Sequence, residues 1–247
     1  MKNKVVELDQ AVAAIKDGQT ILFGDWHGEI SAEEIITGII EKGVKDITAV
    51  GVSGGMPDQG LGRMIVAQQV KKLLTSHIGL NPVAKDQYVA GELEVEFIPQ
   101  GTFTERIRCG GFGLGGCLTP TGVGTAVAEG KQVLNLNGRD YLLEMPIRGD
   151  VALIKATKGD SAGNIYFNKT SGAISNIMAY AADTVICEVE ELVEVGDIDP
   201  DDVAVPAPVV DMIYVRKGEK KPICPMWQRA KAKAEAKAAA AAAEGGK

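Results

Sequence analysis

Residues 17–43 contain one complete strand–loop–helix unit, with the sequence DGQTILFGDWHGEISAEEIITGIIEKG. After an Asp-Gly turn, the apolar residues at 20–23 predict a buried strand. Ser31 and Glu34 have the spacing of a capping box, and isoleucines recur behind them at helical spacing until Gly43. We therefore predict a strand, a glycine-containing loop and a capped helix that ends at Gly43.

The same alternation of strands and helices continues along the chain. Apolar runs predict strands at 47–52, 72–78, 92–98, 151–156 and 184–189, and helices at 61–69, 102–108 and 175–182, the second of these with a capping box formed by Thr102 and Glu105. Continuous apolar strands such as 151–154 are typical of a parallel sheet that is covered on both faces. Asn137-Gly138 predicts a hairpin between 132–136 and 139–144. The predicted fold class is α/β, a three-layer open and mostly parallel sheet with one antiparallel element.

The composition limits the number of domains and the classes of partner. The chain has 247 residues, of which 45% are hydrophobic, which suits one large domain. We place this domain at 1–225, followed by an Ala/Lys-rich tail at 226–247 that is loosely helical or disordered. A net charge of −7 argues against a nucleic-acid partner. The N-terminus has no signal-peptide pattern and no run of 18 apolar residues occurs, so we expect a cytoplasmic protein outside the membrane.

The cysteines and histidines restrict the chemistry. The four cysteines never form a C-x-x-C pair, so neither a zinc site nor a disulfide framework is indicated. Only two histidines are present, His27 and His77. This disfavours a hydrolase triad and a multi-histidine metal centre, and we predict no metal.

Three glycine-containing segments predict a ligand site. In open α/β sheets ligands bind beyond the carboxyl ends of the strands, where helix N-termini offer N–H groups to phosphates, carboxylates and thioester oxygens. The loop 24–30 and the turn 99–101 both join a predicted strand to a predicted helix, and 110–116 is a third glycine-rich loop. The predicted binding residues are Gly24, Asp25, Trp26, His27, Gly28, Glu29, Ile30, Gly110, Gly111 and Gly113.

These motifs resemble coenzyme A transferases of the 3-oxoacid type. The N-terminal match is Asp17-Gly18-x-x-Ile21-Leu22-Phe23-Gly24 and the central match runs from Glu92 through Pro99-Gln100-Gly101-Thr102 to Gly111. It continues at 118–125, 150–156 and 188–191, so the resemblance covers about residues 5–215. It points to the α subunit of the acetate/acetoacetate group and implies the CoA-transferase (NagB/RpiA-like) fold.

The sequence also departs from the family signature. Asp25-Trp26 replaces the second Gly and Phe of its glycine turn, and Ile30-Ser31-Ala32 replaces its Gly-x-Pro. Ala173-Ile174-Ser175 stands where relatives have Asn-Phe-Asn. We expect a turn of different shape, in which Trp26 and His27 line the acyl or CoA channel.

The resemblance implies a ping-pong transfer of CoA from a short-chain acyl-CoA or 3-oxoacyl-CoA to a free carboxylate such as acetate. The covalent intermediate is a glutamyl-CoA thioester on a partner β subunit, in an αβ or α2β2 assembly, because this chain lacks the Ser-Glu-Asn-Gly context of the nucleophile. CoA is then a substrate rather than a permanently bound cofactor. Glu188, Glu190 and Glu191 are predicted to form the exposed edge of a strand.

Gln100 is the predicted catalytic residue of this chain, as a side-chain amide that donates to the thioester oxygen when it becomes negative. Two other functions remain open: a non-catalytic regulatory protein that binds acyl-CoA, and a sugar-phosphate isomerase on the same fold, which would need its own acid and base within one chain.

Overall fold

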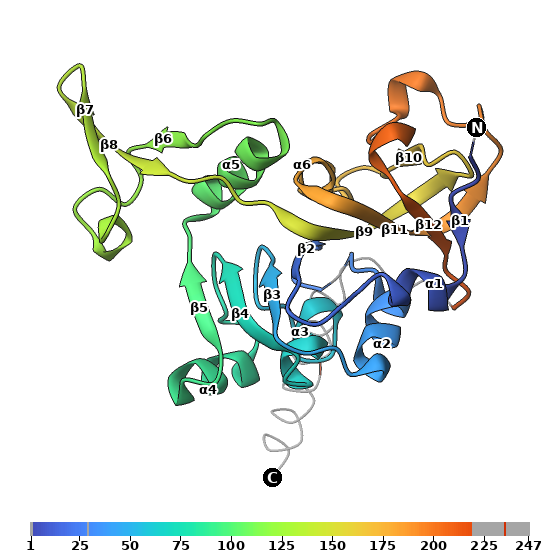
Figure 1. Cartoon of the computed structure of the whole chain (residues 1–247), viewed down its shortest axis with the longest axis horizontal. Helices are drawn as coiled ribbons and strands as arrows, with labels where there is room; N and C mark the ends of the chain where they lie inside the picture. The colour runs from blue at the N-terminus through green and yellow to red at the C-terminus, as the bar shows by residue number, and fades with distance from the viewer. Residues whose placement is uncertain (1, 29, 219–234, 236–247) are drawn as a thin grey trace, which may run out of the picture.

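The computed structural model describes residues 2–28, 30–218 and 235 (Figure 1). Glu29 and the predicted tail at 226–247, apart from Glu235, lie outside the described residues. The predicted domain boundary at residue 225 falls in the same undescribed range and stays a prediction.

The described part of the chain alternates strands and helices, as the sequence predicts. The helices are α1 (Leu8–Ala13), α2 (Glu33–Lys42), α3 (Gly60–Val66), α4 (Pro82–Ala90), α5 (Gln100–Gly111) and α6 (Ser175–Tyr180), with short 3-10 helices at Ala126–Ala128, Pro200–Asp202 and Ala207–Val209. The strands are β1 (Val5–Val6), β2 (Thr20–Gly24), β3 (Ile47–Val50), β4 (Val70–Thr75), β5 (Glu94–Phe97), β6 (Cys117–Thr119), β7 (Val133–Leu136), β8 (Arg139–Glu144), β9 (Gly149–Asp160), β10 (Ile165–Tyr166), β11 (Ala182–Val193) and β12 (Met212–Val215). Among the described residues, no helix is both long enough and apolar enough to cross a membrane.

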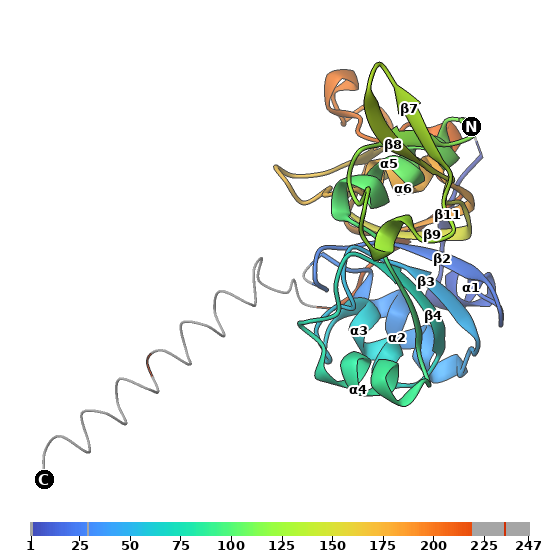
Figure 2. The same ribbon diagram turned by 90° about the vertical axis from the view of Figure 1, so that its left-hand side faces the viewer.

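The large sheet is parallel along its whole order, β1-β12-β11-β9-β2-β3-β4-β5. Among the strands that the structure describes in this sheet, only β10 pairs antiparallel, with β9. The sheet is covered by helices α1 to α4 on one face and by α5 and α6 on the other (Figures 1 and 2). Neighbouring residues of one strand face the two layers in turn, so Val151 and Leu153 pack under the first set of helices while Ala152 and Ile154 pack under the second. The predicted three-layer, mostly parallel α/β fold is confirmed.

The predicted unit at 17–43 forms, but the start of its helix differs from the prediction. Gly43 ends α2 with φ 71°, the left-handed conformation that favours glycine. The capping box of Ser31 and Glu34 is wrong, because α2 begins after Ala32 and the Ser31 hydroxyl donates to Asp25 Oδ2 at 2.9 Å instead. A side chain from another strand caps this helix, as described below.

Helix α5 also begins and ends at other residues than predicted. It starts at Gln100, so Thr102 and Glu105 lie inside it and form no capping box. It continues through Gly110 and Gly111, which the sequence pattern placed in a loop. A Cβ atom at Gly110 would lie 2.0 Å from the Ile147 carbonyl oxygen, so this glycine serves close helix packing.

Strands β6, β8 and β7 form a separate antiparallel sheet that projects from the body of the molecule (Figure 1). Its hairpin is the predicted one, with Asn137 and Gly138 at positive φ of 52° and 79° as a tight turn of this kind requires. Arg106 ties this sheet to the body, since its Nε donates to the Met145 carbonyl at 2.7 Å and its guanidinium pairs with Glu96 at 2.6 Å. We call β6, β7 and β8 the arm.

Candidate active site

The carboxyl ends of β2, β3 and β4 bring the two histidines of the chain together. The rings of His27, after β2, and His77, after β4, lie 5.2 Å apart between centroids. Nδ1 of His27 lies 3.0 Å from Oγ of Ser53, which follows β3 and is fully buried. The Trp26 indole lies 4.9 Å from the His27 ring between centroids. His27 itself has φ 59°, an uncommon conformation for a residue with a Cβ atom. The loop therefore holds this ring in place at a cost in conformational free energy.

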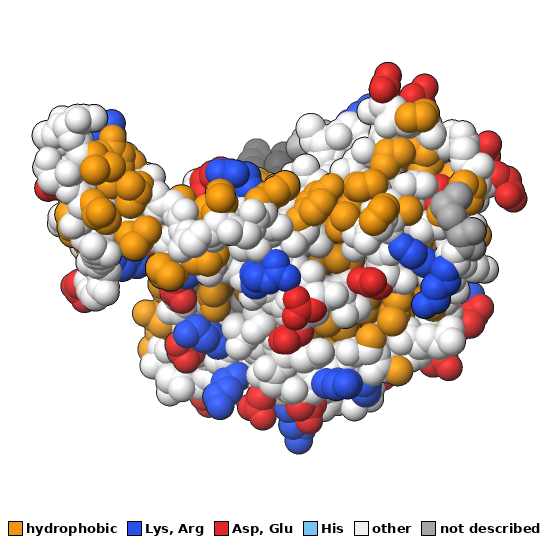
Figure 3. All heavy atoms as spheres, turned by 45° about the horizontal axis from the view of Figure 1, so that its top comes forward, with side chains coloured by type: hydrophobic (Ala, Val, Ile, Leu, Met, Phe, Trp, Pro, Cys, Tyr) orange, Lys and Arg blue, Asp and Glu red, His pale blue; other side chains and the backbone are white. Residues whose placement is uncertain are grey.

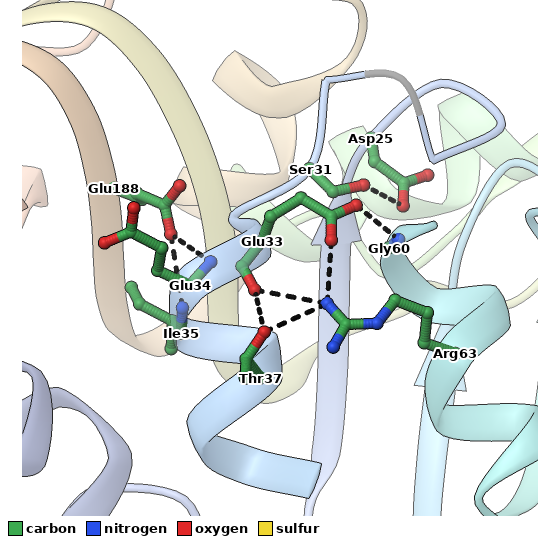
Figure 4. Close-up of polar contacts among 9 residues, drawn as sticks. All are labelled: Asp25, Ser31, Glu33, Glu34, Ile35, Thr37, Gly60, Arg63 and Glu188. Atoms are coloured by element: carbon green, nitrogen blue, oxygen red, sulfur yellow. Dashed lines mark hydrogen bonds and ion pairs between the residues drawn. The ribbon is translucent and has the colours of Figure 1, made fainter. Parts of the chain in front are cut away.

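A buried carboxyl group within this loop, that of Asp25, anchors it to Ser31 (Figure 4). Asp25 is 2% exposed and accepts the Ser31 hydroxyl at 2.9 Å. Burial raises the pKa of Asp25 to about 6, although the hydrogen bond from Ser31 acts in the opposite direction. Gly60 packs directly against both side chains, because a Cβ atom there would lie 2.1 Å from Ser31 Oγ. The loop is therefore anchored to the start of α3.

Glu33 joins α2 to α3 in the same region (Figure 4). Its Oε1 accepts the backbone N–H of Gly60 at 2.7 Å and its Oε2 pairs with Arg63 at 2.8 Å. The same Arg63 guanidinium donates to the Thr37 hydroxyl at 3.0 Å. Glu33 is thus a buried, paired carboxylate that fixes the two helix starts relative to each other.

Glu188 corrects the prediction of an exposed strand edge. It lies on β11, which is paired on both sides, and the residue is fully buried. Its Oε2 accepts the backbone N–H groups of Glu34 at 3.0 Å and Ile35 at 3.2 Å, so it caps α2 (Figure 4). Burial raises the pKa of Glu188 to about 7. The hydrogen bond from the Ile35 N–H group and the Arg216 cation act in the opposite direction and lower this pKa. Glu190 is also largely buried and pairs with Lys155 at 2.8 Å, whereas Glu191 is exposed.

Trp26 and Ile30 line a cavity of about 420 Å³. Its other wall is the loop between β10 and α6, represented by Asn168, Lys169, Thr170, Ser171 and Ala173. The two loops are joined at their base, where the buried Ser175 hydroxyl donates to the Gly24 carbonyl at 2.8 Å. Segments far apart in the sequence thus form the two walls of one cavity.

Gln100 lies in a different cavity, of about 570 Å³. Gln100 is exposed at the first residue of α5, and Thr102, Arg108 and Thr119 line the same space. The Thr102 hydroxyl oxygen is buried without a hydrogen-bond partner among the described residues. Among the described residues, the two cavities share no lining residue, so the structure does not place Gln100 in the cavity of Trp26.

The cavity at Gln100 also contains a thiol and a carboxylate. Burial and the neighbouring Cys109 raise the pKa of Cys117 above its ordinary value, so this thiol is neutral at physiological pH and a poor nucleophile. Glu105 is held by Arg108, whose guanidinium donates to Glu105 Oε2 at 2.8 and 2.6 Å. The described residues contain no group of three or more His, Cys, Asp or Glu side chains that could bind a metal ion.

The structure separates the other predicted binding residues. Gly110 and Gly111 are helix-packing positions, while Gly113 has φ 71° and open space around its Cα. Gly28, in the loop after β2, packs closely against Gln59, because a Cβ atom at Gly28 would lie 2.7 Å from Gln59 Cβ. Glu29 lies outside the described residues.

Sequence reasoning missed one wall of the Trp26 cavity and the helix cap by Glu188. The loop 168–173 is rich in residues that favour turns, and the departure at 173–175 was a signal that this segment differs from relatives. A buried glutamate that caps a distant helix leaves no local pattern.

Comparison with known proteins identifies the family. The family model described as Coenzyme A transferase matches residues 5–216. The chain belongs to this family. It is 42% identical over 220 residues to the alpha chain of the acetate CoA-transferase of Escherichia coli K12, covering 89% of this chain and 100% of that one. It is 39% identical over 213 residues to the alpha chain of the acetoacetyl-CoA:acetate/butyrate CoA transferase of Clostridium acetobutylicum, covering 86% and 98% of the two chains.

A solved structure agrees in fold. The acyl-CoA transferase YdiF of E. coli O157:H7, in a thioester complex with CoA, superposes with a TM-score of 0.79 at 21% identity. The match covers 90% of this chain and 50% of that one, so this CoA-transferase chain spans about half the length of YdiF. The predicted resemblance to an α subunit of a CoA transferase is confirmed, and the comparisons do not favour the regulatory or isomerase alternatives.

Proposed function

We propose that this CoA transferase works as the α subunit of a two-chain enzyme, in which a glutamate of a β subunit is the nucleophile. The observation that carries this proposal is that the glutamates at the start of α2 and on β11 are already engaged in hydrogen bonds of the fold. Glu33 and Glu188 are buried and hold backbone N–H groups, and Glu34 accepts the Tyr214 hydroxyl at 2.6 Å. These carboxylates are engaged in the fold and are poorly placed to attack a thioester.

Two further observations support a partner chain. Relatives that match over nearly their full length are named as subunits, and this chain matches only half of YdiF. The arm carries exposed hydrophobic side chains, among them Leu118, Val133 and Leu136. Figure 3 shows hydrophobic side chains gathered on the arm, at the left of the view. Water-exposed apolar groups of this kind are typical of a surface that another chain covers.

The proposed reaction transfers CoA between two carboxylic acids. The partner's glutamate attacks the acyl-CoA carbonyl and releases CoA thiolate, which leaves a mixed anhydride. The thiolate then attacks the glutamyl carbonyl, giving a glutamyl-CoA thioester and the free acid, and a second acid reverses both steps. The side-chain amide of Gln100 would donate to the carbonyl oxygen as it becomes negative. CoA is consumed and regenerated as a substrate, and the assembly, αβ or α2β2, would lie in the cytoplasm.

Trapping the covalent intermediate tests the proposal. We expect the co-expressed complex, incubated with acyl-CoA and no acceptor acid, to form a thioester that borohydride reduces and hydroxylamine cleaves. Mass spectrometry of the separated chains should place the change on a glutamate of the partner. A label on Glu105 or on any other residue of this chain would overturn the assignment of the nucleophile, and full activity of this chain as a monomer would overturn the two-chain enzyme.

A further inference from the structure

The two histidines of the chain lie at the edge of the sheet where ligands bind in open α/β folds. His27 follows β2 and His77 follows β4, and both side chains are half-buried. The hydroxyl oxygens of Ser53 and Ser76 lie 3.0 Å from Nδ1 of His27 and 3.1 Å from Nδ1 of His77, respectively. An imidazole nitrogen either carries a hydrogen or offers a lone pair, so these hydroxyl groups determine what each ring presents to a ligand.

The hydroxyl group of Ser76 fixes the tautomer of His77, that is, which ring nitrogen carries the hydrogen. Ser76 donates its only hydroxyl hydrogen to the Val52 carbonyl at 2.6 Å, so its oxygen can only accept from His77. The Nδ1 atom of His77 must therefore carry the hydrogen of that contact. A neutral imidazole has one such hydrogen, and its other nitrogen keeps a lone pair. Neutral His77 is thus a hydrogen-bond acceptor at Nε2.

His27 has the opposite tautomer. The hydroxyl oxygen of Ser53 accepts the Gly55 N–H group at 3.2 Å, and Ser53 is fully buried. Among the described residues, the acceptor that its own hydrogen can reach is Nδ1 of His27, so this nitrogen offers the lone pair and Nε2 carries the hydrogen. The two rings lie 5.2 Å apart between centroids. They therefore present different groups at their Nε2 atoms.

The backbone holds His77 in this position. Its carbonyl oxygen accepts the Gly54 N–H group at 3.0 Å and the Thr75 hydroxyl at 3.3 Å, and His77 forms a parallel bridge with Ser53. Strand β4 also pairs with β5, at Thr75 and Phe97. The loop of His77 and the segment that leads into α5 therefore begin one strand spacing, about 4.8 Å, apart. The acceptor at Nε2 is preformed at the ligand-binding edge of the sheet.

A lone pair at this edge distinguishes acids that differ in one group. A hydroxyl group can donate its hydrogen to Nε2, whereas an oxo group has no hydrogen to donate and a methylene group forms no hydrogen bond. With either of the latter, the nitrogen stays unpaired once water is displaced, which costs free energy. The acceptor therefore favours a hydroxy acid over its oxo and unsubstituted counterparts.

We propose that Nε2 of His77 accepts a hydrogen bond from a hydroxyl group on the acyl chain, so that the preferred acid of this CoA transferase is a short hydroxy acid. This inference rests on the proposed function and names the class of acid that it acts on. His77 is then the residue that determines specificity, and Ser76 is a positioning residue that fixes the tautomer of His77.

Acids with a common four-carbon skeleton test the inference. The co-expressed complex receives acyl-CoA with butyrate, acetoacetate or one of the 2-, 3- and 4-hydroxybutyrates as acceptor. We expect kcat/KM for at least one hydroxybutyrate to exceed that for butyrate and for acetoacetate by about tenfold. In His77→Phe this ratio should fall to about one, because no acceptor remains. The matched control is Tyr88→Leu, which removes an aromatic ring from α4 and should leave the ratio unchanged.

Two further variants separate binding from structure. His77→Gln keeps an acceptor oxygen on the side chain and should retain part of the ratio. Ser76→Ala leaves the imidazole in place but removes the acceptor of its Nδ1 hydrogen, so the ratio should fall although the ring is present. If His77→Phe does not assemble with the β subunit, these two variants provide the comparison.

A measurement of the tautomers gives a readout that needs no catalysis. The chain has only two histidines, so labelling the full chain with 15N-histidine gives the signals of two rings, which His77→Phe assigns. At about pH 8, where imidazoles are neutral, we expect the hydrogen of His77 on Nδ1 and that of His27 on Nε2. In Ser76→Ala the hydrogen of His77 should move toward Nε2.

Three results would overturn the inference. The first is CoA transfer in which no hydroxybutyrate exceeds butyrate. The second is a preference for a hydroxybutyrate that survives in an assembled His77→Phe complex. The third is a hydrogen on Nε2 of His77 in the parent chain at the same pH. Absence of transfer to any acid would instead refute the proposed function, whereas the tautomers can be measured in either case.

Discussion

The Oε2 atom of Glu188 lies 3.0 Å from the backbone nitrogen of Glu34, so a central strand caps a helix that is 154 residues away in the sequence. The cap fixes the start of α2, and α2 follows directly on the loop that holds Trp26 and His27. The position of the site loop is thus coupled to the core of the sheet.

Removing this cap should destabilise the fold. In Glu188→Leu the N–H groups of Glu34 and Ile35 lose their acceptor, which typically costs about 1–3 kcal/mol in the free energy of unfolding. Glu188→Gln keeps an acceptor oxygen and should remain within about 1 kcal/mol of the parent at pH 6. Urea denaturation of the three proteins measures the difference. Equal stability of the Leu and Gln variants would show that the cap contributes little.

Two buried carboxyl groups should make stability fall as the pH rises. Burial raises the pKa of Glu188 to about 7 and that of Asp25 to about 6. The unfolded chain releases these protons near pH 4, so the stabilisation is fully present below pH 4 and is lost as the pH rises through 7. We expect the free energy of unfolding to decline by about 4 kcal/mol between pH 5 and pH 8.

The lowered pKa of Glu34 changes the free energy of unfolding in the opposite direction, and it does so at lower pH. Although burial alone would raise its pKa, hydrogen bonds from Tyr214 and Lys217 lower it. Its contribution is therefore present above its ordinary pKa and is lost only in acid. The control for the neutral range is Glu188→Gln, in which the decline between pH 5 and pH 8 should be clearly smaller. An unchanged slope in this variant would mean that Glu188 is ionised throughout.

The order of elements could be predicted because it depends on local patterns. The apolar run at 151–156 and the Asn137-Gly138 turn each contain the information for their own structure, and both predictions are confirmed. Helix α4 was missed although Asn81 caps it, Pro82 starts it and Gly91 ends it, which is a readable signal. The sequence of α4 is only weakly amphipathic, whereas the helix predictions rest on apolar residues that recur at helical spacing.

The contacts of the site could be predicted only in part, because they are made between distant segments. Trp26 and His27 were singled out, yet no local rule indicates that His77 and Ala173 approach them. The capping box at Ser31 failed for the same reason. Ser31 has the right spacing, but Asp25 offers its hydroxyl a buried acceptor, and this tertiary contact replaces the local one.

The pair of Glu33 and Arg63 should behave as one unit. Arg63→Met leaves the 6% exposed Glu33 without its cation, and we expect a loss of about 1–3 kcal/mol in the free energy of unfolding. Adding Glu33→Gln should restore part of this loss, because a neutral amide can still accept the Gly60 N–H group. A double-mutant cycle by chemical denaturation measures the coupling. Additive effects of the two substitutions would show that the ion pair is energetically unimportant.

Gly24 should not tolerate a side chain. A Cβ atom there would lie 2.6 Å from Ser175 Oγ and 2.7 Å from Ile154 Cγ2, at the base of the Trp26 cavity. We expect Gly24→Ala to lower the free energy of unfolding by about 1–3 kcal/mol. Gly79→Ala is the control, since its Cβ would meet nothing within 4 Å. Equal melting temperatures of the two variants would show that the loops shift to accommodate the added Cβ atom at little cost in stability.

The role of Gln100 can be separated from structure because this residue is exposed at the first turn of α5. Attack on the thioester moves negative charge onto the carbonyl oxygen, and a neutral amide can donate to it without losing a proton. We expect Gln100→Ala, co-expressed with the partner, to assemble normally and to lower kcat by about 10²–10³, with much less effect on KM for acyl-CoA. Gln100→Glu should be at least as inactive, since a carboxylate opposes the same charge. Gln132→Ala, another exposed glutamine, controls for loss of a surface amide and should keep full activity. A kcat for Gln100→Ala within about threefold of the parent would mean that other groups stabilise the oxyanion.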